Sequence, residues 1–432
     1  MSFPRYPNYK DSGVEWLGEV PGHWTVTRLK SVASINMGQS PSSDDCTKEE
    51  VGLPFLQGNA DFGEHSPLPR SYCAVANKLA KVSDILFSVR APVGAINIAD
   101  QSYGIGRGLC AITPSSECSM RFIFHALQVM KSELFAVATG STYEAVSIDQ
   151  VGNATCLAPP RPEQIQIAAF LDRETAKIDE LMAEQRRLME LLKEKRSAVI
   201  SHAVTKGMNP NAPMKPSCIE WLGEVPEHWM VIALKRIADV QTGVAKGKDN
   251  KFRTTTTVPY LRVANVQDGY LDLESVATIE IPVEDLARYS LKPGDVLMNE
   301  GGDFDKLGRG HVWDGQIDPC ITQNHVFAVR PHKVSSVWLN AITGSDFAQF
   351  YFMTRSKQST NLASISSTNL MELPVILPPV DEQLAILSFI GNQTARFDTL
   401  TTETQRAITL LQERRTALIS AAVTGQIDVR QQ

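Results

Sequence analysis

The chain has 432 residues, of which 43% are hydrophobic and 21% are charged, and its formal net charge is −6. This length and composition predict a globular protein with two or more domains. No apolar run approaches the roughly 18 residues of a membrane span, and residues 1–7 do not resemble a signal peptide, so we expect a cytoplasmic protein. The negative charge argues against a nucleic-acid-binding protein that acts alone, because phosphate contacts favour an excess of Lys and Arg.

Two segments of the chain occur twice. Residues 14–24, VEWLGEVPGHW, recur as residues 219–229, IEWLGEVPEHW, with nine of eleven positions identical. We call these the tryptophan motifs. Residues 159–205 recur as residues 378–424, with about 22 of 47 positions identical. The sequence therefore predicts a tandem duplication with a period of about 210 residues, too long for a solenoid repeat.

The less similar segments, 25–158 and 230–377, are predicted to be compact α+β domains with long loops. Each mixes short β-like runs with turns marked by Gly and Pro and one helical stretch. Pro54-Phe55-Leu56 in the first segment matches Pro259-Tyr260-Leu261 in the second, so the two align at the level of single residues. The remaining parts are an N-terminal segment 1–24, a linker with the second tryptophan motif at 208–229, and a tail at 427–432.

The repeated segments 159–207 and 378–426 are predicted to be long helices that pair as an antiparallel coiled coil. Their apolar residues recur at steps of three and four, which is typical of a heptad seam. Pro210, Pro213 and Pro216 end the first helix, since Pro lacks the helical donor. The predicted seam consists of Leu171, Ile178, Leu181, Leu188, Leu192, Val199, Ile390, Phe397, Leu400, Leu411 and Leu418.

Three motifs occur twice each and in the same order. They are the tryptophan motif, Pro-Pro-x-x-Glu-Gln at 159–164 and 378–383, and the helix ends at 196–205 and 415–424. With them, essentially the whole chain resembles the specificity subunits (HsdS) of Type I restriction-modification enzymes. The resemblance implies two target-recognition domains that each read half of a split DNA site. It also implies that the helices hold two methyltransferase subunits and, through them, restriction subunits.

A helix of about 43 residues is roughly 65 Å long. In such a protein the paired helices could separate the half-sites by a turn of B-DNA, about 34 Å. A duplicated surface gives two like partners the same docking patch. Aromatic residues often anchor interfaces, although core packing is an equally open interpretation here. The predicted partner-binding residues are Trp16, Trp24, Trp221 and Trp229.

We find no catalytic, cofactor-binding or metal-binding motif. The Pro-Pro pairs at 159–160 and 378–379 lack the Asp/Asn-Pro-Pro-aromatic pattern of an amino-group DNA methyltransferase. Gly104–Gly108 leads into a β-like run, and Gly243–Asp249 lacks the spacing of a P-loop. Seven scattered cysteines predict reduced, mostly buried thiols with neither disulfide nor zinc. We expect a non-enzymatic subunit without cofactors; S-adenosylmethionine, ATP and magnesium would belong to its partners.

The candidate DNA-reading residues are polar side chains on loops of the two variable segments, since Arg, Lys, Asn and Gln match base edges in the major groove. Gln57 aligns with Arg262, and Arg107 aligns with Asn324, a difference that two unlike half-sites would require. A basic run suited to phosphate contacts comprises Lys246, Lys248, Lys251 and Arg253. Weaker candidates, each open to interpretation as a solvated loop side chain, are Asn59, Arg90, Ser141, Thr142, Tyr143, Asn265, Arg309 and Gln323.

Two alternatives stay open. A self-contained DNA methyltransferase would need a catalytic motif that we do not find. A coiled-coil adaptor that binds no DNA is compatible with the negative charge.

Overall fold

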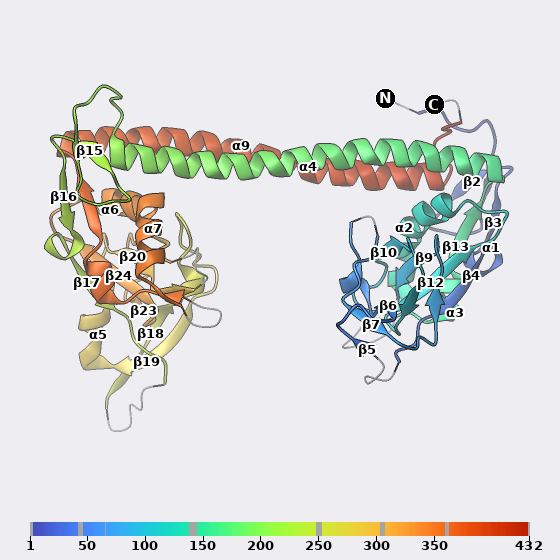
Figure 1. The fold of residues 1–432 in the computed structure, drawn as a ribbon, viewed down its shortest axis with the longest axis horizontal. Coiled ribbons are helices and arrows are strands. Elements are labelled where there is room, and N and C mark those ends of the chain that lie inside the picture. The colour runs from blue at the N-terminus through green and yellow to red at the C-terminus, as the bar shows by residue number, and fades with distance from the viewer. Residues whose placement is uncertain are drawn as a thin grey trace. The chain divides into compact units, whose positions relative to one another are not determined.

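The computed structural model describes residues 3–41, 46–64, 66–137, 145–247, 253–302, 307–358 and 363–430. The chain divides into two compact units. Unit 1 combines Met1–Gln185 with Arg406–Gln432, and unit 2 is Arg186–Gln405. Each unit therefore holds one variable segment together with part of each long helix (Figure 1). The mixture of strands and helices confirms the predicted α+β class.

In unit 1 the variable segment forms two sheets, with strand orders β10-β9-β12-β4 and β5-β7-β6-β11-β8. Strand β3 (Thr25–Arg28) leads into the domain and pairs with β13 (Thr155–Ala158), which leads out of it. The other strands are β1 (Tyr9–Asp11), β2 (Glu19–Pro21), β4 (Ala33–Met37), β5 (Cys46–Thr47), β6 (Leu53–Leu56), β7 (Ser71–Cys73), β8 (Leu79–Ala80), β9 (Ile85–Ser88), β10 (Ile96–Ile98), β11 (Tyr103–Ile105) and β12 (Leu109–Pro114). The helices are α1 (Leu29–Val32), η2 (Asn59–Asp61), α2 (Met120–Val137) and α3 (Ile148–Asn153).

In unit 2 the sheets have the orders β17-β24-β20-β22, β19-β18-β23 and β21-β26-β25, and β16 pairs with β27. The strands are β14 (Met214–Pro216), β15 (Glu224–Pro226), β16 (Met230–Ala233), β17 (Ala238–Thr242), β18 (Thr255–Leu261), β19 (Ala277–Pro282), β20 (Val296–Asn299), β21 (Gly301–Gly302), β22 (Gly310–Val312), β23 (Ile321–Thr322), β24 (Val326–Pro331), β25 (Lys357–Gln358), β26 (Ala363–Ser364) and β27 (Pro374–Leu377). The helices are η3 (Leu234–Arg236), η4 (Val263–Asn265), α5 (Val283–Tyr289), α6 (Ser336–Thr343), α7 (Asp346–Arg355) and α8 (Ser367–Met371).

Central strands of each unit contribute to two hydrophobic cores. In β9, Ile85 and Phe87 belong to the core shared with the long helices, whereas Leu86 belongs to a second core with Tyr103 and Ile105. In unit 2, β20 alternates in the same way between two cores. Successive side chains of a strand point to opposite faces. The uninterrupted apolar runs in the sequence therefore mark strands that are buried on both sides.

The predicted long helices are confirmed as α4 (Arg161–Lys206) and α9 (Val380–Val423), which lie side by side and antiparallel within each unit (Figure 1). In unit 1, Arg415 Nε lies 2.9 Å from Asp179 Oδ1. In unit 2 the matching pair, Arg196 and Asp398, is 3.7 Å apart. Among the described residues, no helix has both the length and the apolar character to cross a membrane.

The predicted seam is correct in part. Leu171, Ile178, Leu192, Ile390 and Phe397 are buried. Val199, Leu411 and Leu418 are half-buried.

The prediction is wrong for Leu181, Leu188 and Leu400, which are 41 to 45% exposed. From Leu171 the buried positions follow steps of four, three and four, through Thr175 and Ile178 to Met182, and in α9 they include Thr404 and Ile408. These leucines, which we assigned to the seam, lie one position before the residues of the heptad core.

The tryptophan motif and the Pro-Pro-x-x-Glu-Gln motif meet at the start of each long helix. The fully buried Trp24 donates from Nε1 to Glu163 Oε1 over 3.1 Å, and His23 Nε2 lies 2.8 Å from Glu163 Oε2. In unit 2, Glu382 accepts from Trp229 over 3.0 Å and lies 2.7 Å from His228. The two motifs therefore form the same hydrogen-bonded contact in each unit. The prediction that Trp24 and Trp229 bind partners is wrong, because both side chains are enclosed in the cores.

The end of a long helix also packs on each buried tryptophan. Gly425 follows α9 with a φ of +73°, and a Cβ there would lie 3.2 Å from Trp24 and 2.4 Å from Pro21. Gly207 follows α4 with a φ of +77°, and its Cβ would lie 3.1 Å from Trp229. Left-handed glycines are common directly after helices. The core of unit 1 therefore depends on the end of the helix that belongs to the second repeat.

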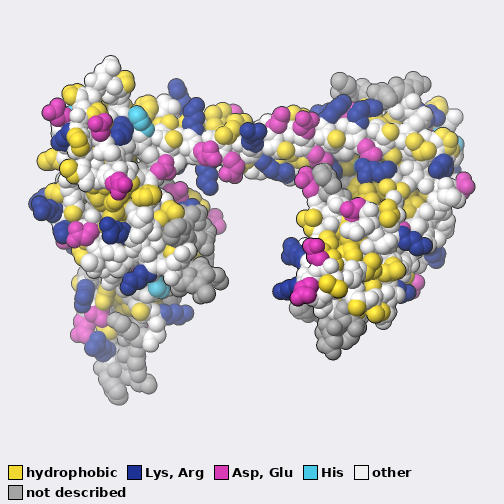
Figure 2. Space-filling model, viewed as in Figure 1, with side chains coloured by type: hydrophobic (Ala, Val, Ile, Leu, Met, Phe, Trp, Pro, Cys, Tyr) yellow, Lys and Arg dark blue, Asp and Glu magenta, His cyan; other side chains and the backbone are white. Residues whose placement is uncertain are grey.

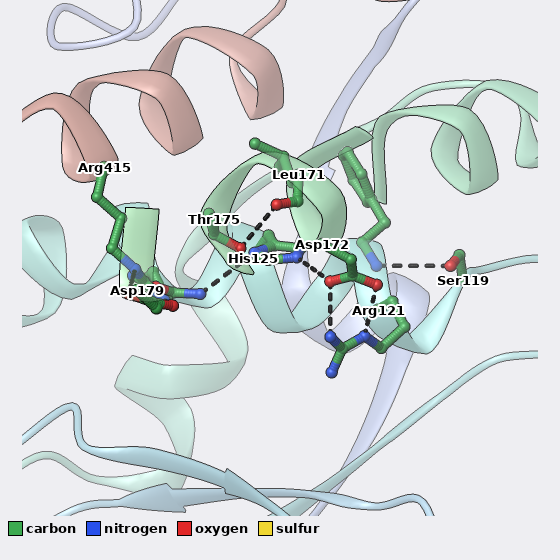
Figure 3. A network of polar contacts seen from close by, with 10 residues as sticks. Ser119, Arg121, His125, Leu171, Asp172, Thr175, Asp179 and Arg415 are labelled. Carbon is green, nitrogen blue, oxygen red and sulfur yellow. Dashed lines mark hydrogen bonds and ion pairs between the residues drawn. The ribbon is translucent and has the colours of Figure 1, made fainter. Parts of the chain in front are cut away.

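A polar network fastens α2 to the helix pair in unit 1 (Figure 3). Asp172 of α4 accepts from Arg121 Nε over 2.9 Å and lies 2.8 Å from Nε2 of the buried His125. Burial alone would raise the pKa of Asp172, but the hydrogen bonds from His125 and Arg121 outweigh it and lower that pKa to about 2.

The expectation that all cysteines are reduced is wrong for Cys46 and Cys73. They stand opposite each other on β5 and β7 and form a disulfide. Their separation of 27 residues gave no sign of this pairing. Cys110, Cys156 and Cys320 are buried thiols as predicted, and burial raises the pKa of each to about 12.

Substituting Gly425→Ala should destabilise unit 1 by more than the roughly 1 kcal/mol expected from the left-handed backbone alone, because the added Cβ meets Pro21. Gly18→Ala is the matched control, since Gly18 has a φ of +62° and open space around it. Thermal denaturation of both variants measures the difference. Equal losses would show that contact with the tryptophan motif is unimportant.

Substituting Asp172→Asn should lower the free energy of unfolding by about 1–2 kcal/mol at neutral pH, after allowance for solvent screening. The folded-state pKa lies below the unfolded value of about 3.9. The stabilisation is therefore fully present above pH 4 and is lost as the pH falls towards 2. Denaturant unfolding from pH 7 to pH 2 should show wild type and variant converging in that window, with Asp149→Asn as an exposed control. A constant difference down to pH 2 would contradict this.

Candidate nucleic-acid interface

Parallel strand pairing brings two loops together in the unit 1 domain. Strands β6 and β11 are parallel neighbours, so both end at the same edge of their sheet. Gln57 follows β6, and Arg107 lies between β11 and β12. The Gly106 amide donates to Leu56 O over 2.8 Å, which fixes the second loop against the first. Gln57 and Arg107 are both exposed there.

The unit 2 domain repeats this geometry with other side chains. Strands β18 and β23 are parallel neighbours, and the Gln323 amide donates to Leu261 O over 2.8 Å. The exposed Arg262 and the half-buried Asn324 thus occupy the places of Gln57 and Arg107. Asn324 Nδ2 lies 3.2 Å from His325 Nε2, and His325 in turn is 3.2 Å from Glu300. We call each group of loops a strand-end surface.

A third loop joins each strand-end surface. In unit 1 the Gln39 amide donates to Ile105 O over 2.9 Å, and in unit 2 the Val244 amide donates to Thr322 O over 2.8 Å. The exposed Gln39 and His325 are candidate reading residues that sequence reasoning missed. Gln39 follows Gly38, and Val244 follows Gly243 at the matching place of the second domain. This shared glycine is the sequence signal that could have identified Gln39.

A buried side chain fixes the first loop of each surface. Asp61 Oδ2 accepts from the Gln57 amide over 2.8 Å, and Asn265 Oδ1 accepts from the Arg262 amide over 2.9 Å. Asn265 is buried and also donates to Asp272 O and Ser275 O. Its prediction as a DNA-reading residue is therefore wrong, because its amide is used entirely within the loop.

The other predicted residues divide into three groups. Asn59 and Gln323 are half-buried within the strand-end loops, and Arg90 and Lys246 are exposed. Arg253 is exposed but lies 3.4 Å from Glu284, and Arg309 lines a cavity beside the helix pair instead of a strand-end surface. Ser141, Thr142, Tyr143, Lys248 and Lys251 lie outside the described residues.

The predicted partner-binding tryptophans also separate. Trp16 and Trp221 remain exposed, whereas their neighbours Trp24 and Trp229 are buried. Trp221 packs against Phe350 at a centroid distance of 5.8 Å.

Within the described residues, no group of three or more His, Cys, Asp or Glu side chains is placed to hold a metal ion.

Charges of both signs are interspersed along the helices and domains on the face drawn in Figure 2. The net charge of −6 gives the chain no overall attraction for phosphate. Two α+β domains with matched but unlike polar loops, each fixed to part of a shared helix pair, define the chain as a two-part recognition protein.

The chain belongs to the family of the Type I restriction modification DNA specificity domain, whose model matches residues 21–190 and 226–410. The resemblance inferred from the repeated motifs is thereby confirmed.

Individual relatives agree with this family. A putative Type I restriction enzyme specificity subunit, MjaX of Methanocaldococcus jannaschii, is 35% identical over a match that covers 44% of each chain. The Type I restriction enzyme StySPI specificity subunit of Salmonella potsdam is 23% identical, with 95% of this chain and 90% of that chain covered. A solved structure that addresses complex assembly and conformational transition of the Type I R-M system has a TM-score of 0.70 at 16% identity, covering 94% of this chain and 98% of that one. This last likeness concerns the fold.

Substituting Arg107→Ala or Asn324→Ala should each weaken binding of the chain, together with its modification subunits, to its own DNA site about 10- to 100-fold, the range for a bidentate base contact. Lys81→Ala is the control, because Lys81 precedes β9 at the opposite edge of the sheet from Arg107. Fluorescence anisotropy with duplex DNA measures the affinities. Arg107→Ala binding no weaker than the control would contradict the assignment of this surface.

Proposed function

We propose that the chain is the DNA specificity subunit of a Type I restriction-modification enzyme and that each strand-end surface reads one half of a bipartite site. The family and the named relatives support this role. The single observation that carries the finer proposal is the unlike pair of side chains at matched places. Gln57 and Arg107 in unit 1 correspond to Arg262 and Asn324 in unit 2, and these side chains match different base edges.

The proposed partners are two modification subunits, one for each repeat, and restriction subunits that join through the complex. Each unit presents the same combination of tryptophan motif, helix start and helix end, so two identical partners would meet the same surface twice. Trp16 and Trp221 are exposed at equivalent places of the two motifs and are suited to anchoring those partners. Partner subunits would also supply phosphate contacts, because a net charge of −6 gives this chain no overall attraction for a polyanion.

Catalysis is assigned to the partners. The Pro-Pro pairs of this chain lead directly into α4 and α9, where Pro159 O and Pro378 O each accept from a Gln side chain over 2.8 Å. The Pro-Pro pairs therefore have a structural role at the start of each long helix. In this proposal the chain binds no cofactor, and S-adenosylmethionine, ATP and magnesium are held by the other subunits. The assembled enzyme works in the cytoplasm, where it meets DNA.

Exchanging residues 25–158 for the corresponding segment of another family member should change one half of the methylated sequence and leave the other half unchanged. The exchange runs from β3 to β13, which pair with each other, so the domain boundary stays intact. Methylome sequencing of the host reads the result. Exchange of residues 230–377 is the reciprocal control and should change only the other half-site.

Both half-sites surviving the first exchange would overturn the reading role of that domain. Methyl transfer by the isolated chain would separately overturn its non-catalytic role.

A further inference from the structure

In unit 2, three side chains of the strand-end surface form a hydrogen-bonded chain that ends on Asn324. Asn324 Nδ2 lies 3.2 Å from His325 Nε2, and His325 Nδ1 lies 3.2 Å from Glu300 Oε2. Among the described residues, the side chain of Asn324 makes no other hydrogen bond. The contact with His325 is therefore the interaction within the protein that acts on this amide.

Backbone hydrogen bonds hold all three residues in place. The Asn324 amide donates to Val244 O over 3.1 Å, and the Glu300 amide donates to His325 O over 2.9 Å. The Ile365 amide in turn donates to Glu300 O over 2.9 Å. The side chains start from fixed points, so their own hydrogen bonds decide how the amide of Asn324 is turned.

The position of one proton determines that orientation. A carboxylate only accepts hydrogen bonds, so the ring nitrogen that faces Glu300, Nδ1 of His325, carries a proton. In a neutral imidazole the other nitrogen, Nε2, is then an acceptor. It accepts from Asn324 Nδ2 and would repel Oδ1. Because the amide group is planar, Oδ1 is left on the side away from the ring as a free acceptor.

Unit 1 lacks this chain at the matching places. Gly108 corresponds to His325 in the repeat. Val89 likewise corresponds to Glu300. The structure agrees with this alignment, since the Val89 amide donates to Gly108 O over 3.0 Å, as in the matching pair of unit 2. The two backbones are equivalent there, and the polar side chains belong to unit 2.

This difference fits the residue proposed to read DNA in each unit. Arg107 has donors and no acceptor, so turning its guanidinium does not change what it offers to a base. Asn324 offers an acceptor at one end of its amide and a donor at the other. In unit 1 a side chain at Gly108 is also excluded, because a Cβ there would lie 2.5 Å from Gln57 O. The unit whose reading residue needs orienting has the side chains that can orient it.

We propose that Glu300 and His325 are positioning residues that hold Oδ1 of Asn324 as the acceptor offered to DNA. Unit 2 thereby selects a base with an exocyclic amino group, adenine N6 or cytosine N4, over one with a carbonyl oxygen at that place, guanine O6 or thymine O4. The inference rests on the proposed function, since it concerns how this surface reads a base.

The exposure of the pair agrees with a role in selection. The side chains of His325 and Glu300 are 53% and 25% exposed. Exposed ion pairs add little to stability. Loss of this pair is therefore expected to change base preference and to leave the midpoint of thermal unfolding nearly unchanged.

The first measurement locates the base pair that Asn324 contacts. The full chain with its modification subunits is titrated, by fluorescence anisotropy, with the DNA site read from the host methylome. Further duplexes each change one base pair to its transition partner, A·T to G·C or the reverse, which exchanges an amino group and a carbonyl oxygen at one place in the major groove. The contacted pair is the one at which wild type discriminates and Asn324→Ala does not.

An analogue that lacks the exocyclic amino group then replaces the adenine or cytosine of that pair. It should weaken binding of wild type but not of Asn324→Ala, because Oδ1 loses its donor. Equal weakening of both proteins would show that the amide does not accept from this group and would overturn the proposed orientation.

Two variants release the amide of Asn324. In Glu300→Gln the new side chain can present oxygen or nitrogen to the ring, so the proton loses its fixed place, and His325→Leu removes the ring. An amide that spends about half its time in each orientation should bind the native site about twofold more weakly. The transition duplex should bind more tightly, so that the preference falls about 5- to 10-fold, the ratio that one hydrogen bond supplies.

Glu274→Gln is the matched control, because it removes the same charge from an exposed position elsewhere in unit 2. If Asn324→Ala alters discrimination at no base pair, the reading role of this surface fails, and the inference fails with it. If Asn324→Ala relaxes one pair while Glu300→Gln and His325→Leu discriminate there as the control does, the reading role stands and the positioning role is overturned. Equally weaker binding of both variants to every duplex would also overturn it, since that is the effect of a purely structural contact.

Discussion

The structure depends on the burial of one tryptophan in each unit. Trp24 and Trp229 are each held by a glutamate from the start of one long helix and by the glycine that follows the end of the other. Three separate segments of the chain converge on a single side chain. Because Gly425 comes from the second repeat and packs in unit 1, neither repeat completes its core alone. A tandem duplication thus becomes two units that both need the paired helices.

From this constraint follows the placement of the polar loops. The helices and the buried tryptophan that each contacts fix the base of each domain. Parallel pairing of β6 with β11 and of β18 with β23 gathers the strand-end loops at one edge of a sheet. The scaffold is the same in both units, while its loop residues differ. Such a division allows the recognised sequence to change without disturbing the fold. Asp172, which bonds Arg121 of α2 in unit 1, aligns with Gly391 in unit 2, so the duplicated scaffold itself has also diverged.

Much of this architecture could be predicted because repeats and helical periodicity are local properties of a sequence. The helices, their pairing and the alignment of Gln57 with Arg262 followed from matching the chain to itself. The errors have two sources, a misreading of the local heptad phase and contacts that the sequence does not reveal. Leu181 and Leu188 were placed in the seam because leucine is apolar, although the heptad phase set by Leu171 assigns those core positions to the following residues. Asn265 is buried by contacts with a loop that a sequence does not reveal.

Contacts between distant segments also explain why the sequence analysis missed Gln39, His325 and the disulfide. Gln39 and His325 join the strand-end surfaces through pairings between strands that are far apart in the chain, and Cys46 meets Cys73 for the same reason.

The most direct test of the account is photocrosslinking of the assembled complex on DNA that carries a photoreactive base in one half-site. Crosslinks should fall on residues 38–40, 57–59 and 106–108 for one half-site and on the matching loops of unit 2 for the other. Crosslinks to the opposite sheet edge around Lys81, or to one unit from both half-sites, would contradict it.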